Sequence, residues 1–72
     1  MQVYGLNYTI WTKVQGSAIA VETSEAKKEV IAVDEEANQY GFGVLDEVRK
    51  IFERVAMKPN CRAELRQLTR VS

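Results

Sequence analysis

Several residue types that usually perform catalysis, bind metals or cross-link small folds are rare or missing in this sequence. The 72 residues include no histidine, one cysteine and one proline. Without histidine, the chain lacks the commonest general base and the commonest metal ligand. With Cys61 as its only cysteine, it has no internal disulfide and no pair of thiolates for a structural zinc ion. We therefore expect no metal site, no cofactor and no enzyme activity.

Long hydrophobic runs are also missing. No purely apolar run exceeds four residues, as at Val30 to Val33, whereas a helix needs about 20 such residues to cross a bilayer. The first eleven residues, MQVYGLNYTIW, have neither the basic start nor the apolar centre of a targeting segment. A single thiol fits a reducing compartment. We expect a soluble, cytoplasmic protein that does not contact membranes.

The length of the chain allows one domain, residues 1–72. A chain this short buries only about 60% of its unfolded surface. Because disulfides and metals are excluded, its stability has to come from tight packing or from association with a partner.

Opposite charges balance over the whole chain but not within its two parts. Residues 1–46 carry three basic and seven acidic side chains, a net charge of −4, and residues 47–72 carry seven basic and three acidic ones, a net charge of +4. Solvated helix faces explain such a pattern. A basic C-terminal surface that binds an anion also explains it.

The N-terminal part predicts a β-hairpin. Apolar residues recur with a period of two from Gln2 to Val14, and Gln15-Gly16 offers a two-residue turn. A second strand follows from Ser17 to Thr23. Residues 28–33 fit either a third strand or a helix that begins at Ser24. The β-branched residues, and the acidic run that follows at Asp34, favour the strand.

Two helices are expected after this sheet. Apolar residues three and four apart predict a main helix from about Val44 to Met57. Pro59 prevents simple continuation, and Asn60 can cap a last helix from Cys61 to about Arg70, with Cys61, Leu65 and Leu68 on its apolar face. The predicted fold is α+β: a three-stranded antiparallel meander, formed by the hairpin and the third strand, followed by two C-terminal helices.

The predicted sheet has an unusually apolar outer face. Pairing the second and third strands through a loop at residues 24–27 places Trp11, Ala20, Ile31 and Val33 together on that face. An apolar patch with an aromatic anchor and a polar rim is typical of a protein contact surface. Coverage of the patch by the last helix is the alternative.

The last predicted helix also offers a candidate basic ridge. Arg62, Arg66 and Arg70 are four residues apart, Lys58 comes just before them, and such a ridge binds phosphates. Cys61 at the start of the same helix could act as a nucleophile. Its position on the apolar face of that helix favours a place in the core instead. The carboxylates at residues 34–36 favour a helix cap over a cation site.

Two functions follow from these patterns. The first is a small, non-enzymatic protein-interaction module that binds itself as a homodimer or binds a larger protein as a regulator or inhibitor, through Trp11, Ala20, Ile31 and Val33. The alternative is a nucleic-acid-binding regulator that uses Lys58, Arg62, Arg66 and Arg70. The sequence does not identify the partner, nor does it separate a host regulator from an inhibitor encoded by a virus or mobile element.

Overall fold

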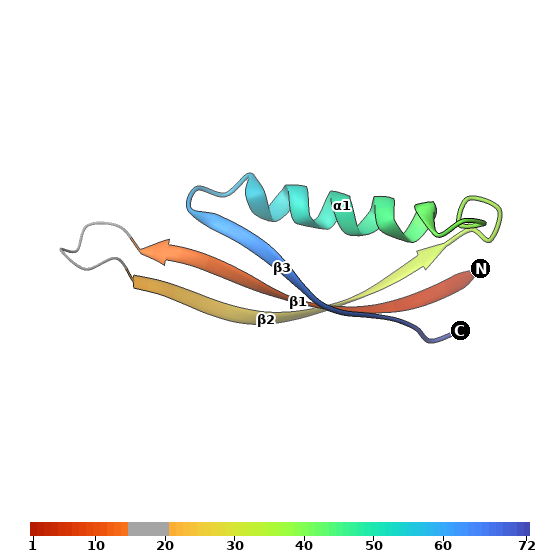
Figure 1. Cartoon of the computed structure of the whole chain (residues 1–72), viewed down its shortest axis with the longest axis horizontal. Helices are drawn as coiled ribbons and strands as arrows, with labels where there is room; N and C mark the ends of the chain where they lie inside the picture. Colours follow the sequence, from red (N-terminus) through yellow and green to blue (C-terminus); the bar gives the residue numbers. More distant parts are fainter. Residues whose placement is uncertain (15–20) are drawn as a thin grey trace.

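A single helix packs along one face of a three-stranded antiparallel sheet (Figure 1). The computed structural model describes residues 1–14 and 21–72. Its elements are β1 (Gln2–Val14), β2 (Val21–Val33), α1 (Phe42–Ala56) and β3 (Cys61–Arg70). The strand order is β2-β1-β3, so the N-terminal strand lies in the centre of the sheet.

The central strand β1 has the clearest period-two pattern of the chain. It pairs with β2 over its whole length, from Gln2 opposite Val33 to Val14 opposite Val21. Its other edge pairs with β3, from Tyr4 opposite Arg70 to Thr12 opposite Cys61. The even-numbered residues of β1 face the helix, and Leu6 among them is completely buried.

The described end of the second predicted strand, residues 21–23, is continuous with the third, and the predicted loop at residues 24–27 is wrong. β2 runs unbroken from Val21 to Val33. The sequence at 24–27 has no glycine, proline or asparagine to turn the chain, and β1 is 13 residues long and can pair with all of β2. The helix alternative from Ser24 is also excluded. The predicted turn at Gln15-Gly16 and the residues up to Ala20 lie outside the described residues.

The last predicted helix is wrong as well, because residues 61–70 form β3. The pairing register shifts between Asn7 and Tyr8 of β1, so that Tyr8 lies opposite Leu65 whereas Asn7 lies opposite Gln67. The extra residue, Arg66, is a β-bulge. Because of this bulge, Leu65 and Leu68 face the same side of the sheet although they are three residues apart, and that spacing imitates a helix.

The main helix spans Phe42–Ala56, slightly earlier than the predicted 44–57. Its buried residues are four and three apart and face the sheet: Val44, Val48, Ile51 and Val55. The helix begins after Gly41, whose φ of 81° lies in the left-handed region that favours glycine. A Cβ atom on Gly43 would lie only 3.0 Å from the carbonyl oxygen of Ala37, so the preceding loop packs tightly here.

Asn38 attaches this loop to both neighbouring elements. Its side chain is buried; the Oδ1 atom accepts a hydrogen bond of 2.9 Å from the backbone N–H of Val44 in the first turn of α1. Its Nδ2 atom donates to Gln2 Oε1 at 2.6 Å and to Tyr4 Oη at 2.9 Å in β1. One side chain therefore caps the helix and fixes its start over the end of the central strand.

The hydrophobic core lies between α1 and the sheet. It consists of eight buried residues from β1, β2 and α1: Leu6, Tyr8, Ile31, Val33, Val44, Val48, Ile51 and Val55. Ile31 and Val33 are 5% and 7% exposed, which shows that odd-numbered residues at this end of β2 face the helix. Within the part of the chain that the structure describes, no helix has the length and hydrophobicity needed to cross a membrane.

Two neighbouring residues of β2 test this register. Ile31→Ala should lower the free energy of unfolding by about 2–5 kcal/mol, because it leaves a cavity in the core. Val30→Ala should change it by no more than about 0.5 kcal/mol, since Val30 is 77% exposed. Urea unfolding followed by the fluorescence of Trp11 measures both. Equal losses, or a larger loss for Val30→Ala, would contradict the register.

Candidate interaction surfaces

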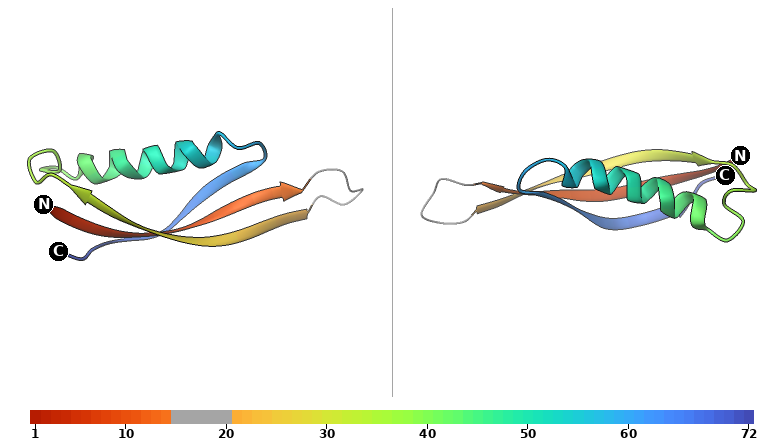
Figure 2. Two further views of the ribbon diagram at one scale, coloured as in Figure 1. Left: turned by 180° about the vertical axis from the view of Figure 1, so that it is seen from behind. Right: turned by 90° about the horizontal axis from the view of Figure 1, so that it is seen from above.

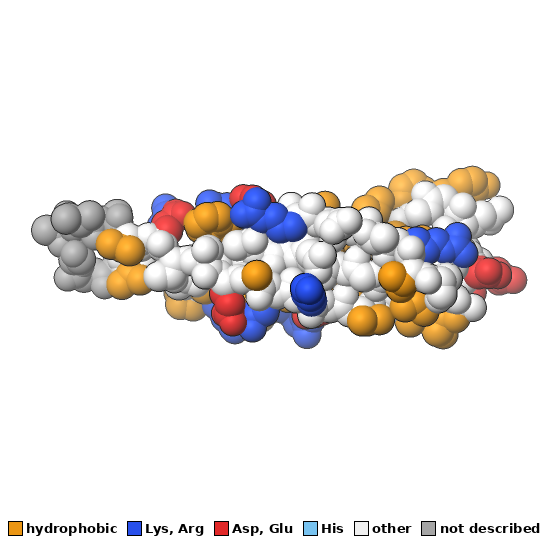
Figure 3. Space-filling model, turned by 90° about the horizontal axis from the view of Figure 1, so that it is seen from below, with side chains coloured by type: hydrophobic (Ala, Val, Ile, Leu, Met, Phe, Trp, Pro, Cys, Tyr) orange, Lys and Arg blue, Asp and Glu red, His pale blue; other side chains and the backbone are white. Residues whose placement is uncertain are grey.

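Within residues 1–14 and 21–72, the sheet is covered on one side, and its other face is open to solvent. Figure 2 shows α1 on a single side of the three strands. The open face carries mostly polar and charged side chains in its middle, whereas hydrophobic side chains gather towards the end where the two termini lie (Figure 3). Val30 lies on this face opposite Gly5 and is among the most exposed apolar residues.

The structure does not bring the predicted partner-binding residues together. Trp11 lies on the open face, half-buried, with the Arg62 guanidinium 5.2 Å from the centre of its ring. Ile31 and Val33 lie on the opposite face in the core. Ala20 is outside the described residues. The predicted patch depended on the loop at 24–27, and with that loop absent its members occupy different faces.

The predicted basic ridge is also dispersed, because it required a helix. On β3, Arg62 and Arg66 lie on the open face, whereas Arg70 pairs with Tyr4 on the helix side. Lys58 is in the turn before β3. The guanidinium groups on the open face lie near carboxylates: Arg62 is 3.6 Å from Glu22 and from Glu64, and Arg66 is 3.0 Å from Glu64.

The structure also places the two minor candidates from the sequence, the Cys61 thiol and the carboxylates that begin at Asp34. Cys61 begins a strand rather than a helix, is partly buried, and its Sγ atom lies 3.5 Å from Thr12 Oγ1. No helix N-terminus therefore acts on its thiol. Asp34 Oδ1 accepts a hydrogen bond of 3.0 Å from the backbone N–H of Glu36, as in a turn cap.

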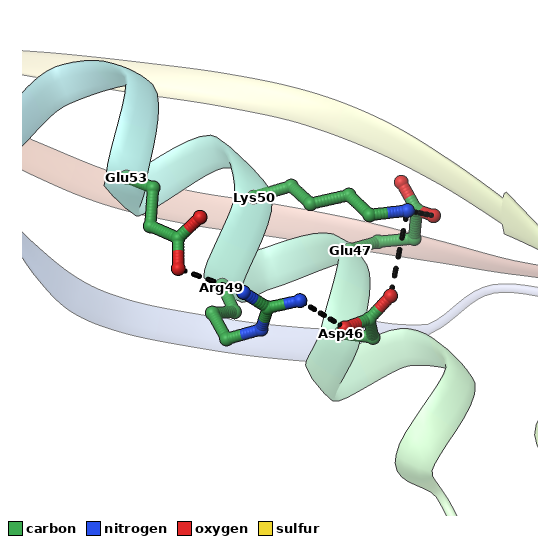
Figure 4. Close-up of polar contacts among 5 residues, drawn as sticks. All are labelled: Asp46, Glu47, Arg49, Lys50 and Glu53. Carbon is green, nitrogen blue, oxygen red and sulfur yellow. Dashed lines mark hydrogen bonds and ion pairs between the residues drawn. The ribbon is translucent and has the colours of Figure 1, made fainter. Parts of the chain in front are cut away.

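The outer surface of α1 is rich in ion pairs. Arg49 bridges Asp46 and Glu53 at 2.6 Å and 2.7 Å, and Lys50 lies 3.3–3.4 Å from Glu47 and Asp46 (Figure 4). Hydrogen bonds from Arg49 and Lys50 hold the pKa of Asp46 below its usual value. These exposed pairs, three and four residues apart, satisfy one another within the helix.

The side of α1 that lies over β2 is charged. Figure 4 shows Glu47 and Lys50 on this side, and Arg54 lies 3.7 Å from Glu29 of β2. Along β2 itself, Lys27 pairs with Glu25 at 2.9 Å. Charged side chains along a sheet edge oppose its pairing with another chain.

The opposite side of α1 carries large apolar residues on either side of the ion-paired Arg49. Figure 4 shows Arg49 on the side over β3, and helical spacing places Leu45 and Phe52 on that same side. β3 adds Leu65 and Leu68 beneath them, on its helix-facing side. We call these four residues the α1–β3 flank: Leu45, Phe52, Leu65 and Leu68. Leu45 is 55% exposed and Leu65 is 49% exposed, so the flank is open to solvent.

An unpaired strand edge runs beside this flank. β3 pairs with β1 on one edge, and no other described strand pairs with its second edge. Sequence alone does not reveal this surface, because the helical period groups Leu45 and Phe52 with the residues of α1 that face the core. The signal in the sequence is the width of the apolar stripe that these residues form together. The stripe is wider than the helix face that packs against a three-stranded sheet.

Tyr8 forms the inner boundary of the flank. Its ring lies 5.9 Å from that of Phe52, and its hydroxyl donates a hydrogen bond of 3.0 Å to Glu29 Oε1. Burial raises the pKa of Tyr8 above its ordinary value, and the hydrogen bond and negative charge of Glu29 raise it further. The folded state therefore holds the phenolic proton more tightly than the unfolded chain does.

The raised pKa predicts a loss of stability at alkaline pH. The stabilising contribution of Tyr8 is complete below the unfolded-state pKa and is lost as the pH rises through the folded-state pKa. Tyr8→Phe should show a weaker alkaline loss in the free energy of unfolding. Absorbance at 295 nm should show one phenolate transition at unusually high pH. The Tyr8→Phe variant should lack this transition, whereas Tyr40→Phe, which changes an exposed residue, should retain it. A high-pH transition that persists in Tyr8→Phe would refute the assignment.

Comparison with known proteins gives no relative for this arrangement. No protein-family model matches the chain, and neither a curated protein nor a solved structure matches it.

Proposed function

We propose that this chain is a non-enzymatic protein-interaction module that contacts its partner through the α1–β3 flank. The observation that carries this proposal is the exposure of Leu45 and Leu65 beside the half-buried Phe52 and Leu68. Soluble proteins seldom leave several large apolar side chains together in solvent unless the patch binds something. Aromatic and large aliphatic residues also supply the anchors of protein interfaces.

The open edge of β3 supplies the second part of the contact. Its outward backbone N–H and C=O groups are available to an extended segment of another chain. A strand added there would place alternate side chains under α1, against the apolar flank. Backbone hydrogen bonds would then give affinity, and the flank would select apolar side chains at alternate positions.

Protein contact suits the described surface better than nucleic-acid contact. The arginines of β3 lie on two faces, and those of the open face are close to Glu22 and Glu64. Phosphate binding needs basic groups that act from one surface without neutralising neighbours. The nucleic-acid alternative stays a prediction, and a role as regulator or inhibitor in the cytoplasm stays part of our proposal.

Selection of binding peptides tests the proposed surface directly. A displayed library of extended peptides would be selected against sparsely immobilised protein, and binding of the selected peptides would be measured in variants. Leu45→Glu should weaken binding about tenfold or more, which corresponds to about 1.4 kcal/mol, because it places a charge in the apolar flank.

Val30→Glu is the matched control, because it adds the same charge to an exposed valine on the open face. Its binding should equal that of the original protein. Hydrogen exchange should also show slower exchange of β3 amides when peptide is bound. Peptides that bind Leu45→Glu normally, or that slow exchange in β2 instead of β3, would refute the proposed surface.

A further inference from the structure

The edge strand β3 is complementary to a second copy of itself. We propose that the partner on the α1–β3 flank is another molecule of this chain, and that the two β3 strands pair antiparallel around a two-fold axis at Leu65. This inference rests on the proposed function, since it names the partner for the same surface. The dimer would contain one continuous sheet with the strand order β2-β1-β3-β3-β1-β2.

Counting along β3 gives a consistent register for this pairing. The bulge at Arg66 lets Arg66 and Gln67 share one position in the ladder. With Leu65 opposite Leu65 of the partner subunit, Ala63 lies opposite the partner subunit's Leu68. These residues all lie on the helix side of the sheet and are apolar. Directly opposed residues share a face, so the apolar side of each strand meets its equivalent.

The polar side of the same register is complementary in charge. Glu64 lies opposite Arg66 and Gln67 of the partner subunit, and Arg62 lies opposite the partner subunit's Thr69. No like charges oppose one another directly at these positions. A register centred on Glu64 would instead place that carboxylate against its own copy, which destabilises a sheet. The charges therefore exclude an axis at Glu64 and are compatible with an axis at Leu65.

The position of α1 strengthens the pairing. Neighbouring strands lie about 4.8 Å apart, and a two-fold axis perpendicular to the sheet keeps both helices on one face. Phe52 contacts Tyr8, which pairs with Leu65, so Phe52 lies near the proposed axis. Leu45 is two helical turns away along the same side of the helix. The two apolar flanks would thus face each other across the dimer.

The other sheet edge is charged where β3 is apolar. The helix side of β2 carries Glu25, Lys27 and Glu29 at successive positions. A β2–β2 axis at Lys27 would oppose that lysine to its own copy and Glu25 to Glu29 of the partner subunit. The edge is also bordered by the charged side of α1. Association through β3 buries apolar surface, whereas association through β2 would bury mainly charged groups.

Light scattering after size exclusion tests the dimer over a range of protein concentrations. We expect a mass that rises to twice the 8.2 kDa of the chain. Leu65→Glu should raise the dissociation constant about tenfold or more, because it opposes two carboxylates on the axis. Val21→Glu is the matched control on β2, since Val21 is 47% exposed against 49% for Leu65, and it should dimerise normally. Circular dichroism would confirm that both variants fold.

Cross-linking tests the register. In a Cys61→Ser background, Leu65→Cys should form a disulfide-linked dimer under mild oxidation, whereas Val21→Cys should not. A protein that stays monomeric at all concentrations would overturn the dimer, even if selected peptides still bind through Leu45. A dimer that Leu65→Glu leaves intact, or that cross-links through Val21→Cys, would overturn the proposed interface.

Discussion

The pairing of β1 along both of its edges is the constraint on which the rest of the structure depends. Because β2 and β3 both run antiparallel to β1, they are parallel to each other and lie at opposite edges of the sheet. The chain between them has to cross one face of the sheet, and α1 makes that crossing. One helix covers one face, which leaves the other face and both edges without cover among the described elements.

The exposed parts of this sheet are not equivalent. The edge at β2 is bordered by ion pairs from the strand and from α1, which makes strand addition unfavourable. The open face is mainly polar, and its only tryptophan is partly covered by Arg62. Among the described residues, the α1–β3 flank combines an unpaired backbone edge with several large apolar side chains from a strand and a helix. A small domain with a limited core gains most from association at such a place.

The sequence predicted the parts of the fold that depend on local pattern. The long first strand and the main helix follow from periods of two and of three to four, and the α+β class follows from both. The remaining errors have two physical causes. Residues 24–27, Ser-Glu-Ala-Lys, predict a loop, but pairing with β1 overrides their weak β-propensity. The bulge at Arg66 places Leu65 and Leu68 on the same side of the strand although they are three residues apart. Only the pairing register with β1 reveals this bulge. The predicted site residues are separated for the same reasons, because Ile31, Val33 and the arginines lie on other faces than expected when these two elements change.

Symmetry explains how a modest surface could support a specific dimer. In an isologous interface each contact outside the axis occurs twice, and a residue on the axis meets its own copy. In the proposed dimer, the outward edge of β3 would pair both of its ends with one partner strand, while Phe52 and Leu45 of each subunit would cover that ladder on the helix side of the sheet. The backbone hydrogen bonds at the joint would then form beneath two apolar side-chain layers. Shielding of this kind makes an unpaired or shifted register costly, because buried N–H and C=O groups would lack partners. In the proposed dimer, the backbone hydrogen bonds of the β3 edge and the apolar flank above it would both contribute to affinity, and the side chains that oppose one another would fix the register.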